Sequence, residues 1–179
     1  SIDFVILTHA HMDHSGLLPK LMRKGFSGQI FLTPPSAQLS EILLLDAAKI
    51  QESNVYSMNT EGGGHGQSDI IYTTFDSLNT IGAFTSIDFD NEVEIGAGLK
   101  IRFFRAGHIL GAGSVCIDIS GTRLVFSGDL GRRNESLIQS FYPLPSYLGE
   151  VDYIVMESLY GGVVHQTRDD ATNELLNII

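Results

Sequence analysis

A run of histidines directly after an apolar strand constrains this chain more than any other feature. Residues 2–7 read Ile-Asp-Phe-Val-Ile-Leu and predict a short strand, and the next residues are Thr8-His9-Ala10-His11-Met12-Asp13-His14. Imidazoles and carboxylates are side chains that bind zinc and similar ions. A loop at a strand end can turn several side chains into one small volume. The chain must therefore fold so that this strand end opens onto a metal centre.

Two weaker signals lie at later strand ends. His108 stands between glycines after a predicted strand over 99–104, and Asp129 follows Gly128 after one over 123–126. Each alone is typical of a turn or a helix cap. Together with the first run they supply six candidate metal ligands, namely His9, His11, Asp13, His14, His108 and Asp129. Because strand ends can converge on one edge of a layered fold, we expect these side chains to meet there.

The remaining pattern predicts helices on both sides of a run of strands. We expect helices through 17–22, from Pro34 to Ile50 with Thr33 as N-cap, over 75–81 and over 169–179. Further strands are expected over 29–32, 86–89, 92–95, 114–119 and 153–156, with a hairpin turn at 120–122. The apolar stripe of the helix from Pro34, which includes Ile42 and Ile50, predicts a covering sheet. The polar residues 53–68, with His65 among glycines, predict a loop.

Composition and charge exclude several classes of protein. The chain has 179 residues, of which 43% are hydrophobic and 18% charged, as in one globular domain. A net charge of −10, with eight acids and no Lys or Arg between Ile50 and Leu99, argues against a surface that simply coats nucleic acid. No apolar run approaches the ~20 residues of a membrane span, and no secretory signal is visible. The single Cys116 excludes an internal disulfide and favours a cytoplasmic location.

The pattern H-x-H-x-D-H, followed by a later histidine and a later aspartate, resembles the metallo-β-lactamase fold superfamily. Two further segments are similar to its β-CASP nuclease branch, which includes ribonuclease J and the cleavage and polyadenylation nuclease subunit. Residues 157–161 read Glu-Ser-Leu-Tyr-Gly and resemble that branch's E-S-T-Y-G segment, with Leu159 in place of Thr, and residues 44–52 resemble one of its helices. The resemblance implies an α/β fold of the αββα sandwich type, with mostly antiparallel sheets and outer helices. It also implies that residues 1–179 form a single incomplete domain, without the β-CASP domain and the C-terminal metal-ligand region.

The resemblance assigns roles to the candidate ligands. His9, His11 and His108 resemble the ligands of one zinc ion. Asp13 and His14 resemble ligands of a second, and Asp129 resembles the carboxylate that bridges both. The second site lacks one histidine, which in this family lies beyond the inserted domain. Two zinc ions are therefore expected only in the complete enzyme.

Four residues are expected to act in catalysis or in substrate binding. Asp13 and Asp129 are expected to take part in catalysis, Asp13 by helping to orient the nucleophile. Glu157 resembles the acidic residue that supports the site and orients its histidines. His165, which follows the Glu157 segment, is expected near the substrate mouth.

The resemblance implies a metal-dependent hydrolase that cleaves RNA phosphodiesters with a hydroxide activated by two metal ions. RNA is the expected partner, with no membrane contact, and a homo-oligomer or a complex with related subunits is an open alternative. Other hydrolases of this fold, such as thioesterases of the glyoxalase II kind, lactonases and β-lactamases, would use the same hydroxide on a carbonyl. A further alternative, which is not an enzyme, is a non-catalytic scaffold or metal-binding fragment. A purely structural zinc site is disfavoured, because such sites close with four ligands, often cysteines.

Overall fold

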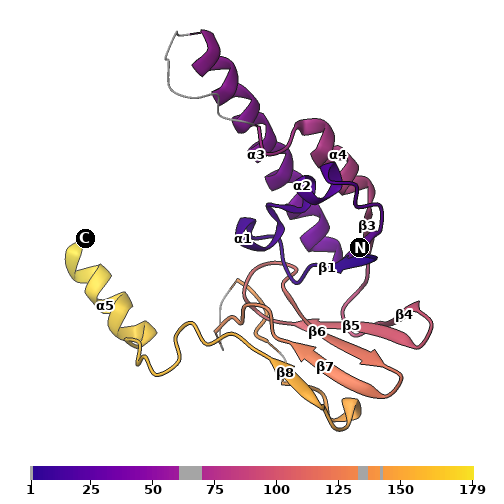
Figure 1. Cartoon of the computed structure of the whole chain (residues 1–179). Coiled ribbons are helices and arrows are strands. Elements are labelled where there is room, and N and C mark those ends of the chain that lie inside the picture. The colour runs from indigo at the N-terminus through magenta and orange to yellow at the C-terminus, as the bar shows by residue number, and fades with distance from the viewer. Residues whose placement is uncertain (1, 61–69, 133–136, 142) are drawn as a thin grey trace.

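The first sheet is parallel and carries the histidine run at one end. The computed structural model describes residues 2–60, 70–132, 137–141 and 143–179. Strands β1 (Phe4–Ile6), β2 (Gln29–Leu32) and β3 (Phe84–Ser86) pair in this order. Parallel neighbours need long crossovers, and these are supplied by α1 (Met12–Ser15) and α2 (Leu18–Arg23), then by α3 (Pro34–Thr60) and α4 (Thr74–Gly82). Figure 1 shows these helices together on the outer side of the sheet.

The second sheet is mainly antiparallel. Its order is β4 (Glu92–Gly96), β5 (Leu99–Arg105), β6 (Gly113–Ile119), β7 (Thr122–Phe126) and β8 (Tyr153–Val155), of which only β8 is parallel to its neighbour. The predicted turn between β6 and β7 is confirmed, with φ of 53° at Ser120 and 95° at Gly121. Positive φ at both positions is typical of two-residue hairpin turns, whose twist matches that of the strands.

The two sheets pack face to face because successive side chains of each strand point to opposite faces of its sheet. Phe31 of β2 meets Ile101 and Phe103 of β5 between the sheets, whereas Ile30 and Leu32 of β2 face the helices. The outer face of the second sheet packs against the short 3₁₀ helix η1 (Ser146–Leu148). The described residues therefore form three layers, helices, sheet and sheet, and the predicted α/β fold with two sheets is confirmed.

The last helix, α5 (Arg168–Ile178), stands apart from these layers. Its N-terminus is capped by Thr167 Oγ1, which accepts a hydrogen bond from the Asp170 N–H at 3.2 Å. None of its residues is buried, and Figure 1 shows it at the end of an extended C-terminal arm. No helix in the described part of the chain is both long and apolar enough to cross a membrane.

Three sequence predictions about local structure are wrong. Residues 53–60 continue α3 instead of forming a loop, since this stretch contains no glycine or proline. Residues 87–89 leave the sheet, because Ile87 makes a last bond to the Leu32 carbonyl before the chain crosses to the second sheet. Ile42 and Ile50 are 65% and 52% exposed, so no sheet covers them. His65 and its glycines lie outside the described residues.

The face of α3 that is buried consists mostly of small side chains one turn apart. Ser36, Ser40, Leu44 and Ala48 are each 0% exposed. Small side chains let α4 approach closely, and the Ser77 hydroxyl of α4 donates to the Leu44 carbonyl at 3.0 Å. Contacts with α4 and, at Ser36, with the Gly111 carbonyl of the loop after His108 therefore decide which face of α3 is buried, and periodicity alone does not reveal them.

Candidate metal centre

Three strand ends bring the predicted ligands to one edge of the sandwich. β1 leads into His9, and α1 begins directly after His11, so its first turn carries Asp13 and His14. His108 lies in the loop between β5 and β6, and Asp129 follows β7. The Gly113 N–H donates to the Thr8 carbonyl at 2.9 Å and joins the two sheets at this edge.

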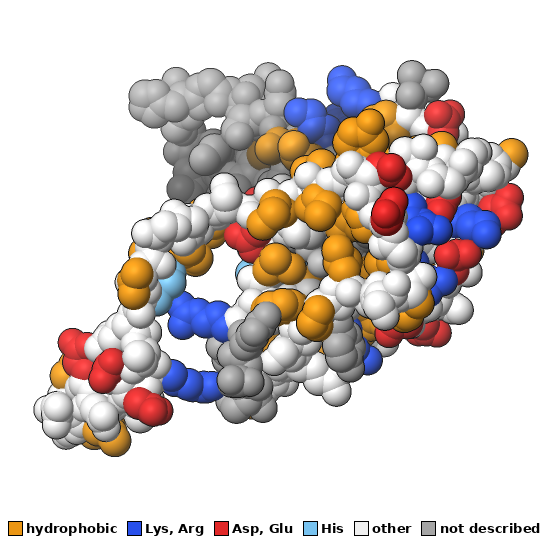
Figure 2. All heavy atoms as spheres, turned by 90° about the horizontal axis from the view of Figure 1, so that it is seen from below, with side chains coloured by type: hydrophobic (Ala, Val, Ile, Leu, Met, Phe, Trp, Pro, Cys, Tyr) orange, Lys and Arg blue, Asp and Glu red, His pale blue; other side chains and the backbone are white. Residues whose placement is uncertain are grey.

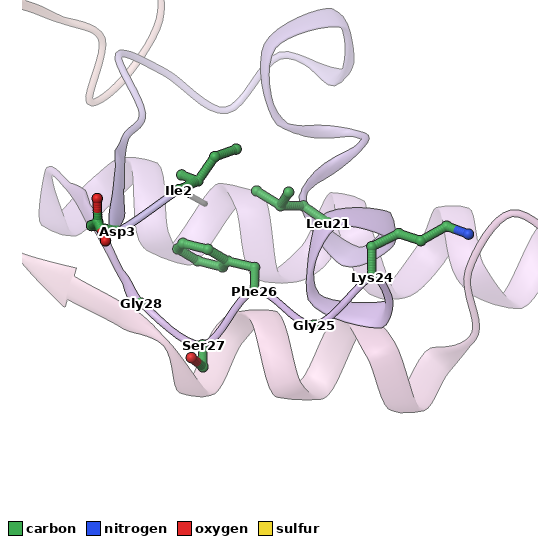
Figure 3. Close-up of a pocket in the computed structure, with 8 residues that line it drawn as sticks. All are labelled: Ile2, Asp3, Leu21, Lys24, Gly25, Phe26, Ser27 and Gly28. Atoms are coloured by element: carbon green, nitrogen blue, oxygen red, sulfur yellow. The ribbon is translucent and has the colours of Figure 1, made fainter.

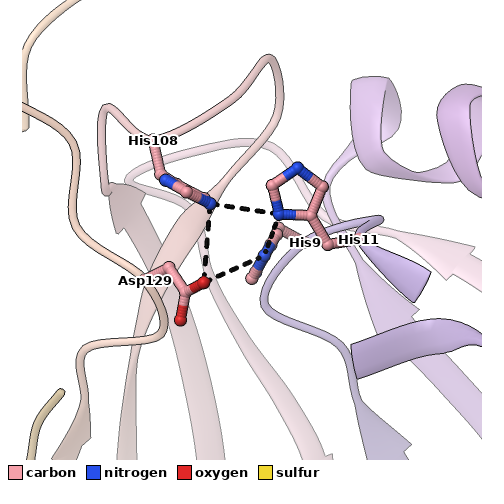
Figure 4. A group of neighbouring side chains, drawn as sticks. All are labelled: His9, His11, His108 and Asp129. Atoms are coloured by element: carbon pink, nitrogen blue, oxygen red, sulfur yellow. Dashed lines mark hydrogen bonds and ion pairs between the residues drawn. The ribbon is translucent and has the colours of Figure 1, made fainter. Parts of the chain in front are cut away.

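Four donor atoms converge in a geometry that suits a metal ion (Figure 4). The ligand atoms of His9, His11, His108 and Asp129 all lie within 4.8 Å of one another. His11 Nδ1 is 3.1 Å from both His9 Nε2 and His108 Nε2, and Asp129 Oδ2 is 3.6 Å from His9 Nε2 and 3.5 Å from His108 Nε2.

This spacing favours a shared metal ion over a network of hydrogen bonds. Ligands bound at about 2.0–2.1 Å in a tetrahedron lie about 3.3 Å apart, which falls inside the observed range. One ring nitrogen can carry one proton or accept one, yet His11 Nδ1 faces two other ring nitrogens at the same distance. The group can therefore hold one metal ion.

A second pair of ligands lies beside the first group. His14 Nε2 is 3.5 Å from Asp13 Oδ2 and 3.5 Å from Asp129 Oδ1. Asp129 thus directs one oxygen towards His9 and His108 and the other towards His14. The side chain of Asp13 is 77% exposed, so this second group opens to solvent. The arrangement fits the predicted bridging carboxylate, and the roles themselves stay predictions.

The surroundings of His9 favour its uncharged imidazole, which is the form that binds metal ions. It is 0% exposed, and burial, followed by the nearby His14, lowers the pKa of His9 from 6.5 to about 4, although Asp129 acts in the opposite direction. The Thr8 hydroxyl lies 3.1 Å from His9 Nδ1 and holds the ring with Nε2 towards the other ligands. Because metals bind the unprotonated imidazole, His9 is available for binding at neutral pH.

Glu157 contacts the loop that carries Asp129. Its Oε1 accepts a hydrogen bond from the Leu130 N–H at 2.6 Å, and its own N–H donates to the Ser127 hydroxyl at 3.0 Å. Glu157 therefore fixes the chain on both sides of Asp129. Among the described residues these bonds go to the loop and not to a histidine, so a role in orienting histidines stays a prediction.

His165 lies on the C-terminal arm. Its ring meets Tyr160 edge-on, with centroids 4.6 Å apart. No interaction joins it to the metal ligands within the described part of the chain. Its place at the substrate mouth stays a prediction.

A cavity of about 650 Å³ lies at the opposite end of β1 (Figure 3). Ile2, Leu21 and Phe26 line it together with the backbone of the turn after α2. It contains no histidine, and its one acid, Asp3, precedes β1, whereas the metal ligands follow that strand. The cavity is therefore separate from the metal centre.

Sequence reasoning missed a tether that holds the His108 loop. The Thr33 and Ser36 hydroxyls both donate to the Gly111 carbonyl, at 2.6 and 2.9 Å, and both side chains are buried. The sequence predicted Thr33 as the N-cap of α3, and Thr33 Oγ1 does accept a hydrogen bond from the Ser36 N–H at 3.4 Å. The second partner of Thr33 Oγ1, the Gly111 carbonyl, lies 78 residues away in the sequence, and no local signal marks that contact.

We expect opposite effects from two serine-to-alanine changes on one face of α3. Ser36→Ala removes a buried hydrogen bond and should lower the free energy of unfolding by about 1 kcal/mol. Ser40 Oγ is buried without a partner among the described residues, so Ser40→Ala should be neutral or stabilising by up to about 1 kcal/mol. Urea unfolding of both variants measures the difference. Equal losses in both would contradict the assigned hydrogen bonds.

Comparison with known proteins agrees with this geometry. Residues 1–157 match the family model described as a metallo-beta-lactamase superfamily domain. The chain is 30% identical to the endoribonuclease YSH1 of Candida glabrata over 99% of this chain and 22% of the relative. It is 32% identical to the ribonuclease TTHA0252 of Thermus thermophilus over 99% of this chain and 36% of the relative. It is 29% identical to the cleavage and polyadenylation specificity factor subunit 3-I of Arabidopsis thaliana over 100% of this chain and 24% of the relative.

The chain spans well under half the length of each of these relatives. The family match covers both sheets and every candidate ligand. With its candidate ligands gathered at one edge of two packed sheets, the chain belongs to the metallo-beta-lactamase superfamily, and its relatives are the β-CASP nucleases that its motifs resemble.

Proposed function

We propose that the full protein hydrolyses phosphodiester bonds of RNA with metal ions held at this centre. The observation that carries the proposal is the convergence of His9, His11, His108 and Asp129 within 4.8 Å, with Asp13 and His14 beside them. Names of relatives that act on RNA support the substrate class. Three imidazoles and a carboxylate favour zinc over magnesium, which prefers oxygen ligands.

Asp129, Asp13 and Glu157 would have different roles at this centre. When bound, two metal ions supply Lewis acidity and lower the pKa of coordinated water towards ~7. Asp129 offers one oxygen to each ligand group, at 3.5–3.6 Å from the ring nitrogens, and so keeps the two groups in register. Asp13 turns Oδ2 towards His14, and its side chain is 77% exposed, so the carboxylate can accept a hydrogen bond from an attacking water. Glu157 and Ser127 hold the Asp129 loop in place.

The distribution of charge around the site supports a polyanionic substrate. The chain as a whole carries −10, and its acidic residues would repel RNA at long range. Figure 2 shows, however, that Lys and Arg side chains border the gap between the C-terminal arm and the body, with histidine and acidic side chains at its edge. Basic groups placed there can hold backbone phosphates while the acidic surface disfavours binding elsewhere.

We also propose a wider setting for this domain. A β-CASP domain and a C-terminal region that completes the second metal site are supported by the greater length of the relatives. They are also supported by exposed apolar residues of β8, where Tyr153, Ile154 and Val155 are 62%, 56% and 55% exposed. The name of the plant relative, a subunit, supports a complex with related chains. A cytoplasmic location is supported by the lone Cys116, which is buried and free.

Chelation tests the proposed function directly. We expect cleavage of an end-labelled RNA by the full protein to fall at least about 100-fold in excess chelator and to return when zinc is added, because the ligand groups contribute no nucleophile of their own. A thioester offered under the same conditions should remain intact. Undiminished RNA cleavage in chelator, or preference for the thioester, would contradict the proposal.

A further inference from the structure

Arg105, the last residue of β5, lacks the partners that an arginine at this depth normally has. Its guanidinium lies over the Phe89 ring at 4.9 Å, and its Nε is buried without a hydrogen-bond partner. No hydrogen bond or ion pair joins its side chain to any described residue. On the same strand Arg102 pairs with Glu92 at 3.0 Å. A partly buried cation without an anion is unfavourable, so Arg105 points to an anionic ligand.

A cavity of about 190 Å³ lies next to this guanidinium. Arg105 is the one charged residue among the described residues that line it, and Ile109, Leu110 and Ile138 supply apolar walls. The volume holds about six water molecules and is smaller than the 300–1,000 Å³ pockets of drug-sized ligands. It suits a flat base whose phosphate reaches the guanidinium, and not a whole cofactor.

The cavity and the metal centre share one loop. His108 directs its ring towards the other ligands (Figure 4), whereas the next two residues, Ile109 and Leu110, line the cavity. Arg105 is paired in the sheet with Gly113, whose N–H bonds to the Thr8 carbonyl beside His9. A chain of nucleotides that passes through the centre can therefore reach the cavity with a neighbouring residue.

We propose that this cavity is a subsite for an RNA nucleotide that flanks the cleaved bond. Arg105 binds its phosphate, since a guanidinium matches phosphate oxygens with two parallel hydrogen bonds. The apolar walls receive its base, as apolar and aromatic surfaces do in single-strand recognition. This inference rests on the proposed function, because it takes its substrate class from there.

Binding of RNA in excess chelator tests the subsite without catalysis. The full protein is titrated, in chelator, into a fluorescent single-stranded RNA at several salt concentrations. We expect Arg105→Gln to weaken binding roughly tenfold and to reduce the slope of log K against log salt by about 0.7, as expected for one phosphate contact in a single strand. Arg102→Gln, on the opposite face of the same strand and paired with Glu92, is the matched control and should leave both quantities unchanged.

A second variant keeps the proposal testable should Arg105→Gln fold poorly. Leu110 is 61% exposed, so Leu110→Glu should fold, and its carboxylate at the cavity should weaken RNA binding. Leu78→Glu, at a 54% exposed site on α4, is its control. Binding by Arg105→Gln and Leu110→Glu within twofold of the unmodified protein would overturn the subsite.

Inorganic phosphate separates a nucleotide subsite from a simple anion site. Competition by millimolar phosphate should be much weaker than competition by unlabelled RNA, because phosphate cannot use the apolar walls. Equal competition by phosphate would overturn the assignment to a nucleotide. Arg105-dependent RNA binding without any cleavage after zinc is restored would contradict the proposed function alone, so the two failures are distinguishable.

Discussion

Asp129→Ala should abolish metal binding at both predicted sites, because this one carboxylate faces both ligand groups. Its Oδ2 lies near His9 and His108 and its Oδ1 near His14. We expect elemental analysis to show about two zinc ions per full-length protein and fewer than one in the variant. RNA cleavage should fall by more than the 10–100-fold typical of residues that merely support a ligand.

Single-histidine variants provide the graded comparison. His14→Ala should remove only the metal ion at the open group, whereas His11→Ala should remove the ion that His9 and His108 also hold. Asp118→Ala is the control for loss of an ordinary carboxylate, since Asp118 pairs with Arg123 on the second sheet at 3.1 Å. Asp129→Ala protein that keeps both metal ions would show that Asp129 is not a ligand, and the two-site arrangement would then be wrong.

Much of the site was predictable because its residues sit where strands end. The histidine run, His108 and Asp129 each follow an apolar strand. Because the strands belong to two packed sheets, their ends can lie at only a few edges of the sandwich. The local geometry of Asp129 was not predictable in this way. The two bonds of Glu157 to Ser127 and Leu130 join segments about 30 residues apart, and only the folded chain brings them together.

The fold was predictable from the sequence where the hydrophobicity of a side chain indicates whether that side chain is buried. The short apolar run at 30–32 correctly predicted the strand β2, whose Phe31 and Ile30 face different layers. The apolar stripe of α3 was a poorer guide, because Ile42 and Ile50 are exposed and Ser40 is buried. A helix that packs closely against another helix favours small side chains at the contact, and hydrophobicity is a poor guide to that face.

Gly131→Ala should disrupt the metal centre without changing any ligand. The Gly131 N–H donates to the Ala106 carbonyl at 2.9 Å, which brings the chain after Asp129 against the chain before His108. A Cβ at Gly131 would overlap the carbonyl group of Gly107 and lie 2.8 Å from the backbone nitrogen of His108. Because both obstacles are backbone, one of the two loops must move.

The movement should separate His108 from Asp129, whose ligand atoms are 3.5 Å apart. Overpacking of this kind costs about 1–3 kcal/mol of stability, and misplacement of a ligand should weaken metal affinity about 10–100-fold. Competition with a chromophoric chelator measures the affinity, and thermal unfolding measures the stability.

Gly82→Ala is the matched control for this change. Gly82 ends α4, and a Cβ there meets nothing within 4 Å, so alanine should be neutral or stabilising by about 0.4–1 kcal/mol. If Gly131→Ala keeps the metal affinity of the unmodified chain while Gly82→Ala behaves as expected, the close approach of the two loops does not set the ligand geometry. Loss of affinity in Gly131→Ala alone would establish that the backbone contact between Gly131 and Gly107 holds two of the three strand ends in register.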